Sequence, residues 1–207
     1  MPEWLVAVVA VATAYLLGSF PAGYLLGRLR GIDMLEQGSG RTGGTNVLRS
    51  AGPVAALVTG ALDVGKGALA VWLASQITDY TAVHVLAGAA AILGHNHSIF
   101  LHFRGGAGVG TSLGALGAIY LPAALGLLVL LLLVIAITRY ASIGSLTVIT
   151  LMPIVLLVLA LTGILSLAYV AYGLLAWAII VYAHRPNIRR LIAGTERRLG
   201  GGKHPSS

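Results

Sequence analysis

The sequence of 207 residues contains no cysteine and few charged side chains. The absence of cysteine excludes disulfide bonds, thiolate metal sites and a cysteine nucleophile. Charged residues make up only 9% of the chain, whereas soluble globular domains carry roughly 25%. Because 57% of the residues are hydrophobic, the composition is that of an integral membrane protein. Acidic residues are the scarcest charged type, with six against 13 lysines and arginines.

Long apolar runs predict an all-α fold of about seven transmembrane helices. A helix of about 20 apolar residues crosses a hydrocarbon core of roughly 30 Å. Clear candidates are 4–29, 142–163 and 165–183, and 81–95 is a shorter one. Because proline is favoured at helix starts, Pro122 divides the next run into helices over about 107–120 and 121–138. The run 53–77 contains Asp63 and Lys66, and it predicts either one long helix or an interfacial piece followed by a short span from about Ala61.

The positions of the basic residues predict how these helices are oriented. If seven spans alternate, one side receives nearly all lysines and arginines, while the turns near 75–80, 119–122 and 161–166 contain none. By the positive-inside rule the basic side is cytoplasmic, which leaves the N-terminus outside and the C-terminus inside. The chain is then a single membrane domain over 1–207. Glycine-rich cytoplasmic loops lie at 31–52 and 96–111, and a basic cytoplasmic tail lies at 184–207.

Both cytoplasmic loops combine glycine with arginine and hydroxyl side chains. Residues 38–46 read GSGRTGGTN, and residues 104–111 read RGGAGVGT. Glycine lets backbone N–H groups approach an anion closely, hydroxyls add donors, and arginine adds charge. Two such loops on one face predict phosphate binding at the membrane surface. The first loop also matches the dinucleotide fingerprint, but that motif needs a βαβ unit, which a loop between spans does not provide.

Ionisable groups lie inside or beside the predicted spans, where they are costly and become candidates for function. Asp63 and Lys66 are three residues apart, so they share a helix face and predict an ion pair. His95 at a span end fits either a general base or a packed, hydrogen-bonded side chain.

Five segments, in order along the chain, resemble one known family. They read GSGRTGGTNVLR at 38–49, LDVGKG at 62–67, GHNHSIFLHFRGGAGVGT at 94–111, TRYAS at 138–142 and HRPNIRRLIAGTE at 184–196. In order and spacing they are similar to the bacterial acyl-phosphate:glycerol-3-phosphate acyltransferases, the PlsY family.

The resemblance implies an enzyme of the cell inner membrane whose active site faces the cytoplasm. It would transfer an acyl group from acyl phosphate to the 1-hydroxyl of glycerol 3-phosphate, giving lysophosphatidate and phosphate for phospholipid synthesis. The resemblance implies membrane lipids as partners, and it implies no cofactor, metal or nucleic acid. The alternative is a non-catalytic relative that binds or transports a phosphate-bearing lipid or metabolite.

The family pattern also assigns roles to individual residues. Ser39, Arg49 and His95 are the catalytic candidates, of which the first two would orient the reacting groups. The base would be either His95 or a substrate phosphate, and in the second case His95 is structural. The substrate-binding candidates are Thr45, Asn46, Lys66, Arg104, Gly105, Gly106, Gly108, Thr111, Ser142, His184 and Asn187.

Two positions depart from the family pattern. The first motif usually has asparagine where this chain has Arg41, and the glycine-rich motif usually has lysine where this chain has Ala107. A missing phosphate-binding lysine removes charge-assisted hydrogen bonds. Either Arg41 compensates from the neighbouring loop, or the activity is weakened or altered.

Overall fold

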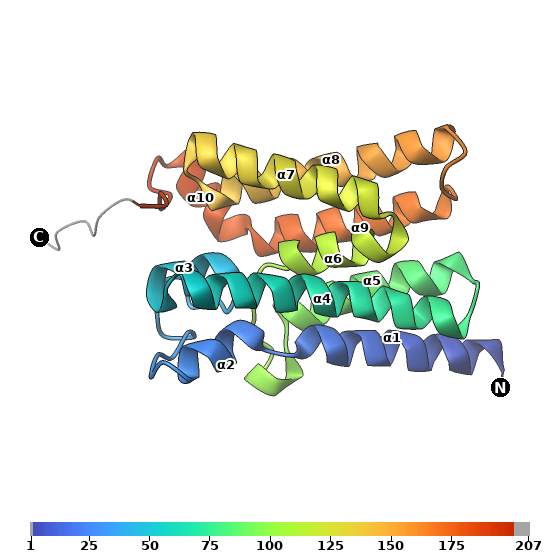
Figure 1. Ribbon diagram of the computed structural model, residues 1–207, viewed down its shortest axis with the longest axis horizontal. Helices are drawn as coiled ribbons and strands as arrows, with labels where there is room; N and C mark the ends of the chain where they lie inside the picture. The colour runs from blue at the N-terminus through green and yellow to red at the C-terminus, as the bar shows by residue number, and fades with distance from the viewer. Residues whose placement is uncertain (1, 201–207) are drawn as a thin grey trace, which may run out of the picture.

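The computed structural model describes residues 2–200, and this part of the chain is built from helices joined by short loops. The long helices run parallel or antiparallel to the longest axis, with the start of α1 and the short helix α10 at opposite ends of the molecule (Figure 1). The helices are α1 Glu3–Ser19, α2 Ala22–Arg28, α3 Gly44–Ala51, α4 Pro53–Ile77, α5 Thr81–Asn96, η1 Ile99–Leu101 (a short 3-10 helix), α6 Val109–Ile119, α7 Leu121–Thr138, α8 Ala141–Leu161, α9 Ala168–Ala183 and α10 Arg185–Ile192.

Within residues 2–200, four helical segments are long and apolar enough to cross a membrane. They are Glu3–Arg28, which joins α1 and α2, together with α4, α7 and α8. The apolar helices α6 and α9 are shorter, and α5 has 16 residues. The run 53–77 forms one uninterrupted helix, so the first of its two predicted forms is confirmed. The division at Pro122 is also confirmed, because α6 ends at Ile119 and α7 begins at Leu121.

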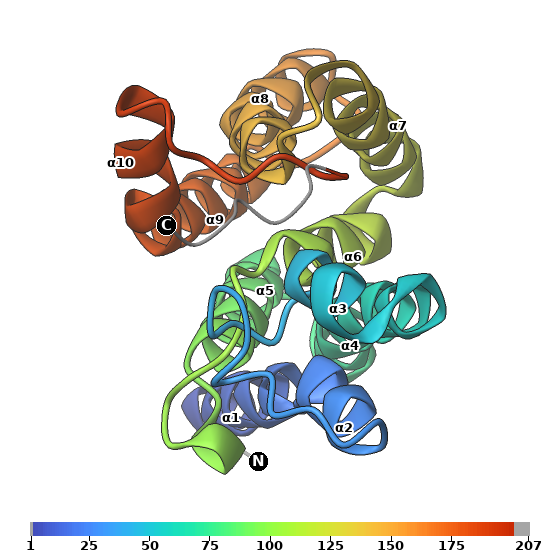
Figure 2. The same cartoon turned by 90° about the vertical axis from the view of Figure 1, so that its left-hand side faces the viewer.

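The helices form two groups when seen along the long axis (Figure 2). One group contains α1, α4 and α5, and the other contains α7, α8 and α9 (Figure 2). The groups meet where α5 packs against α9 and α6 packs against α7. A buried tyrosine links α9 to α6 at this junction. The Tyr172 hydroxyl of α9 donates a hydrogen bond to the backbone oxygen of Ser112 in α6 at 2.7 Å.

Helix α6 lies against α4 at a distance that only glycine permits. A Cβ atom at Gly114 would overlap the Val64 carbonyl oxygen, and one at Gly67 would overlap the carbonyl oxygen of Thr111. Membrane helices often use small residues in this way, because close backbone approach increases van der Waals contact where no hydrophobic effect drives association. The close contact fixes the start of α6 beside the middle of α4.

The first span, expected as one run over 4–29, is broken at Phe20 and Pro21. Proline lacks the N–H that would continue the helix, so carbonyl groups in the preceding turn lose their partners. Lys66 donates to the Phe20 oxygen at 2.9 Å, and the Ser98 hydroxyl donates to the Ser19 oxygen at 2.6 Å. These bonds satisfy the freed backbone groups, as a membrane interior requires.

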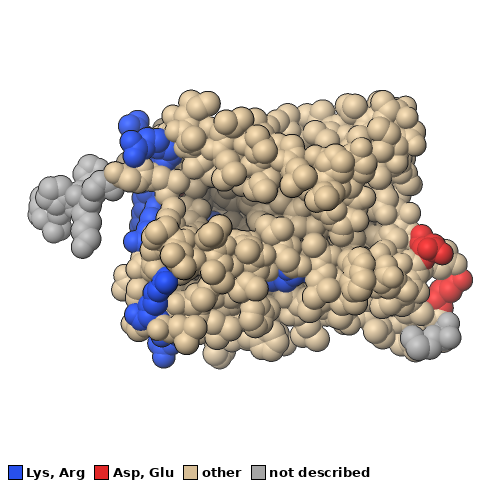
Figure 3. All heavy atoms as spheres, in the orientation of Figure 1, with Lys and Arg blue, Asp and Glu red and all other residues tan. Residues whose placement is uncertain are grey.

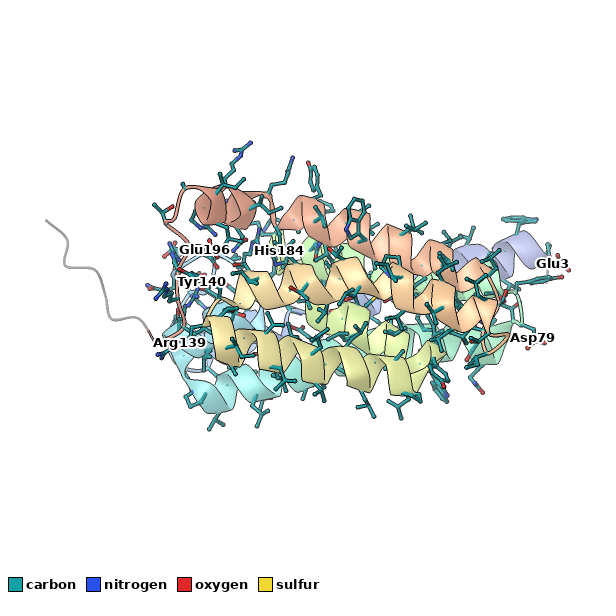
Figure 4. All side chains as sticks on the ribbon, turned by 90° about the horizontal axis from the view of Figure 1, so that it is seen from above. Glu3, Asp79, Arg139, Tyr140, His184 and Glu196 are labelled. Carbon is teal, nitrogen blue, oxygen red and sulfur yellow. The ribbon has the colours of Figure 1, made fainter. Side chains whose placement is uncertain are left out.

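Charged side chains are divided between the two ends of the molecule. Lysine and arginine gather at the end that carries α3 and α10, together with Glu196, whereas the charged side chains seen at the other end are acidic (Figure 3). The acidic residues there are Glu3 and Asp79 (Figure 4). We refer below to the first of these as the basic end.

Candidate active site

A cavity of about 410 Å³ lies at the basic end, where the two groups of helices face each other. Its wall is formed by the loop 38–44, α3, α4, the loop before α6, the adjoining ends of α7 and α8, and the chain from His184 onward. The surface is hollowed beside the basic end, between α4 and α7 (Figure 3). The cavity therefore collects both glycine-rich loops and the C-terminal segment.

The first glycine-rich loop is held in shape by the buried side chain of Asn46. Its Oδ1 accepts the backbone N–H of Ser39 at 3.1 Å, and its Nδ2 donates to the backbone oxygens of Gln37 and Arg41 at 2.9 and 2.8 Å. Both N–H donors of the amide are thus used within the loop. Asn46 lines the cavity, and its side-chain hydrogen bonds fix the backbone around Ser39 and Arg41.

The second glycine-rich loop presses against the end of α5. A Cβ atom at Gly105 would overlap the His95 carbonyl oxygen, and one at Gly106 would overlap the His95 ring. Gly108 has a φ of +88° and immediately precedes α6, so the first turn of that helix faces the cavity. The N-terminal end of a helix carries unpaired backbone N–H groups and a partial positive charge, which favour a bound anion.

A buried charged cluster supports the floor of the cavity. Asp63 Oδ1 lies 2.8 Å from Lys66 Nζ and 3.3 Å from His95 Nδ1. The predicted ion pair between Asp63 and Lys66 is therefore confirmed. All three side chains are buried, and Asp63 and His95 also line the cavity. The carboxylate thus orients the His95 ring from its Nδ1 side.

On the opposite wall, Glu196 accepts hydrogen bonds from three side chains of two helices, α8 and α10. Its carboxylate accepts from Ser142 Oγ at 3.0 Å, from Asn187 Nδ2 at 2.8 Å and from Arg190 Nε at 2.7 Å. Burial raises the pKa of the Glu196 carboxyl, but the hydrogen bonds from Asn187, Arg190 and Ser142 outweigh it and leave this pKa below its usual value. The carboxylate is therefore ionised and ties the C-terminal segment to α8 and α10.

The structure brings most of the sequence-predicted site residues into one cavity wall. Those that line it are Ser39, Thr45, Asn46, Arg49, His95, Gly108, Ser142, His184 and Asn187. The other five lie outside the wall. Lys66 is paired with Asp63, Arg104 is exposed, Gly105 and Gly106 pack on α5, and Thr111 is buried in α6.

Five charged residues of the wall were not among the predicted site residues: Arg41, Asp63, Arg190, Glu196 and Arg197. Two of them carried a signal in the sequence: Arg41 is an unusual residue inside the first motif, and Asp63 is an ionisable group inside a predicted span. Glu196 and Arg190 also lie in a recognisable motif, but no spacing rule shows that the chain folds back over the cavity.

The cavity carries an excess of positive charge. Arg41, Arg49, Arg190 and Arg197 line it, together with the acids Asp63 and Glu196. Asp63 is neutralised by Lys66, and Glu196 by Arg190. Within residues 2–200, no acidic side chain lies within ion-pair distance of the other three arginines. Such a wall suits a ligand that carries one or more phosphate groups.

A second cavity, of about 450 Å³, is lined almost entirely by apolar atoms. It follows the same helices away from the basic end. Along α4 its lining begins at Val64, the residue after Asp63, and along α7 it begins at Leu128, one turn from Leu131 of the first cavity. Its remaining lining residues are Ala68, Leu69, Trp72, Leu113, Gly114, Gly117, Ala118, Leu121, Ala124 and Leu125.

Comparison with known proteins gives a consistent family. The family model described as glycerol-3-phosphate acyltransferase matches residues 8–194. A curated glycerol-3-phosphate acyltransferase from Synechococcus sp. (strain CC9902) is 46% identical over 195 residues, covering 94% of this chain and 96% of the relative.

Two solved structures are also similar, and both are crystal structures of PlsY, an integral membrane glycerol 3-phosphate acyltransferase. The glycerol 3-phosphate form matches with a TM-score of 0.85 and 34% identity, covering 94% of this chain and 96% of that one. The lysophosphatidic acid form matches with a TM-score of 0.84 and 34% identity, covering 94% and 95%.

Proposed function

The chain belongs to the glycerol-3-phosphate acyltransferase family, and we propose that it acylates the 1-hydroxyl of glycerol 3-phosphate with acyl phosphate as donor. It is a multi-pass membrane acyltransferase of phospholipid synthesis. The products of the proposed reaction are lysophosphatidate and inorganic phosphate. One arrangement carries this proposal: an arginine-rich cavity adjoins an apolar cavity on the same helices.

This arrangement fits the anionic phosphate groups of both reactants and the apolar acyl chain of the donor. Glycerol 3-phosphate and the phosphate of the donor are anionic, and they match the guanidinium groups of Arg41, Arg49 and Arg197 in the cavity wall. The acyl chain is apolar and matches the cavity between α4, α6 and α7. The ester bond would then form at the border of the two cavities, near Asp63 and the start of α6.

For this reaction the protein needs mainly to position the two substrates and to stabilise negative charge. Acyl phosphate is a mixed anhydride with a good leaving group, so no covalent enzyme intermediate is needed. The glycerol hydroxyl adds to the acyl carbonyl, the C–O bond to phosphate breaks, and the hydroxyl proton passes to a base. Ser39 and Arg49 orient the reacting groups, while Ser142, His184 and Asn187 belong to the substrate-binding wall beside them. Donors fixed in advance stabilise the developing negative charge without reorganisation.

The proton acceptor is either His95 or a phosphate oxygen of a substrate. The His95–Asp63 contact supports the first, because a carboxylate that orients a histidine ring strengthens it as a base. A His95→Asn variant separates the two. Loss of a general base lowers kcat by about 10²-fold or more with binding unchanged. A fall below about tenfold assigns the proton to the phosphate.

For the topology we propose seven spans in the cell inner membrane, with the N-terminus outside and the C-terminus in the cytoplasm. The three helices α5, α6 and α9 complete the four longer segments. The gathering of arginine at one end supports a cytoplasmic active site (Figure 3). The last residues of the predicted basic tail, 201–207, lie outside the described residues.

Purified protein in detergent tests the activity directly. Glycerol 3-phosphate is supplied with palmitoyl phosphate or palmitoyl-CoA, and lysophosphatidate and inorganic phosphate are both measured. We expect equal amounts of the two products from palmitoyl phosphate and none from palmitoyl-CoA. No product from either donor, or equal rates from both, contradicts the proposal.

A further inference from the structure

Arg41 extends from the first glycine-rich loop to the junction of α9 and α10. One terminal nitrogen of its guanidinium donates to Asn187 Oδ1 at 3.2 Å, and the other donates to the Ala183 backbone oxygen. A guanidinium has five N–H donors, so three are left by these two bonds. Arg41 is also part of the cavity wall, and its bond to Ala183 places it beside His184, which lines the same cavity.

The residue is held at both ends. Its backbone oxygen accepts from Asn46, and its guanidinium is fixed by Asn187. The Asn187 amide is itself oriented from two sides, because its oxygen accepts from Arg41 and its nitrogen donates to Glu196. Arg41 therefore presents its remaining donors in one position, which lowers the cost of binding an anion.

The surroundings of Arg41 favour an anion. Burial, and then the nearby Arg190, lower the pKa of the Arg41 guanidinium, whereas Glu196 raises it. The group stays charged, but it is partly desolvated, and its nearest carboxylate is already occupied by three other donors. Across the cavity, the second glycine-rich loop contributes the methyl group of Ala107 and no charge.

We infer that Arg41 is a substrate-binding residue that contacts a phosphate group at the α9–α10 side of the cavity. The inference rests on the proposed function. The phosphate belongs either to glycerol 3-phosphate or to the acyl phosphate, since both present the same anionic oxygens.

Binding measurements on the full chain in detergent test this assignment independently of turnover. The variants are Arg41→Gln, Ala107→Lys, the two combined, and Arg189→Gln as control. Arg189 is exposed at the same basic end and does not line the cavity. The dissociation constants for glycerol 3-phosphate and for palmitoyl phosphate are measured for each, together with the unfolding temperature.

We expect Arg41→Gln to weaken one of the two ligands by about tenfold or more, as a lost charge-assisted hydrogen bond does. The ligand whose dissociation constant rises is the one whose phosphate group Arg41 contacts. Adding Ala107→Lys returns positive charge to the same cavity from the facing loop. The double variant should therefore bind the affected ligand at least about threefold more tightly than Arg41→Gln alone. Arg189→Gln should stay within about twofold of the wild type.

Two results would overturn the assignment. In the first, Arg41→Gln leaves both dissociation constants within about twofold of the wild type. In the second, the double variant binds no more tightly than Arg41→Gln, which makes Arg41 a structural tie between the loop and α9. Wild-type protein that binds one of the two ligands through Arg41 but shows no turnover would remove the proposed function and leave the assignment in place.

Discussion

The two cavities are lined by neighbouring turns of the same helices, yet they have opposite chemistry. Along α4 the change occurs between Asp63 and Val64, and along α7 it occurs between Leu131 and Leu128. The polar cavity contains four arginines and the first turn of α6, and the apolar one contains mainly leucine, alanine and glycine. Apart from Asp63 in the interior of α4, the charged groups of the polar cavity come from loops and short helices, whereas the interiors of the long helices supply apolar surface.

The largest effect is expected where the two cavities meet. In Asp63→Leu, the Lys66 ammonium stays buried without its carboxylate, and His95 loses its orienting partner. Breaking a buried pair in this way costs about 3–5 kcal/mol, so we expect a large fall in the unfolding temperature and loss of activity. The measurement is thermal unfolding in detergent.

The double variant Asp63→Leu with Lys66→Met is the control. It removes both charges, so we expect it to regain much of the stability lost by Asp63→Leu alone. A single variant as stable as the wild type would show that the pair does not hold the border between the cavities.

The next effect belongs to the polar cavity alone. Arg49→Ala removes a guanidinium that lines the cavity and that donates to the Arg197 backbone oxygen at 2.9 Å. Loss of a charge-assisted hydrogen bond of about 1.5–3 kcal/mol predicts a fall of about 10–100-fold in kcat/KM for glycerol 3-phosphate. The preference among acyl chain lengths should not change. A variant with normal kcat/KM, or with an altered chain-length preference, would break the division of roles.

Much of this arrangement could be predicted from the sequence, because long runs of apolar residues indicate membrane helices. Pro122 marked the corner between α6 and α7, and the spacing of Asp63 and Lys66 gave their ion pair. The break at Pro21 was missed, because the apolar run continues through it. The hydrogen bond from Lys66 to the Phe20 oxygen joins residues that are far apart in the sequence and is seen only in the folded chain.

The site was predicted less completely than the fold. Polar residues of the two loops were found, since glycine with arginine and hydroxyls is a local signal. Glu196 was not assigned to the site, because its role depends on contacts with Ser142 and Asn187 that no local spacing encodes. Arg104 was predicted from its neighbours in the sequence, yet its side chain lies outside the cavity wall.

A smaller effect is expected in the apolar cavity. Gly117 lines it, and an added Cβ would make only ordinary contacts with Ala124 and Leu121. Gly117→Leu should therefore fold, and its side chain should displace part of the acyl chain. At about 0.8 kcal/mol per displaced methylene, we expect kcat/KM for palmitoyl phosphate to fall about tenfold and that for octanoyl phosphate to change less.

Gly126→Leu is the matched control for this variant. Gly126 is exposed on α7, and nothing lies within 4 Å of an added Cβ. It should leave both substrates unaffected. An equal loss for short and long chains in Gly117→Leu would place the acyl chain elsewhere.

The smallest effect concerns the segment that closes the polar cavity. The pKa of Glu196 is lower in the folded protein than its ordinary value, so its ionised form stabilises the fold above that ordinary value. This contribution is lost as the pH falls through the lowered pKa. Glu196→Gln should cost about 1 kcal/mol at neutral pH, and its difference from the wild type should shrink in acid. Unfolding temperatures at several pH values measure this, and a difference that grows in acid would contradict it.

In the proposed enzyme, one cavity binds the phosphate and the other binds the acyl chain. The position of lysophosphatidate bound to the wild-type protein, determined crystallographically, tests this division most directly. We predict the phosphate between Arg49 and the first turn of α6, with the acyl chain running past Gly117 between α4 and α7. A chain that lies on any other face of the molecule would contradict this division.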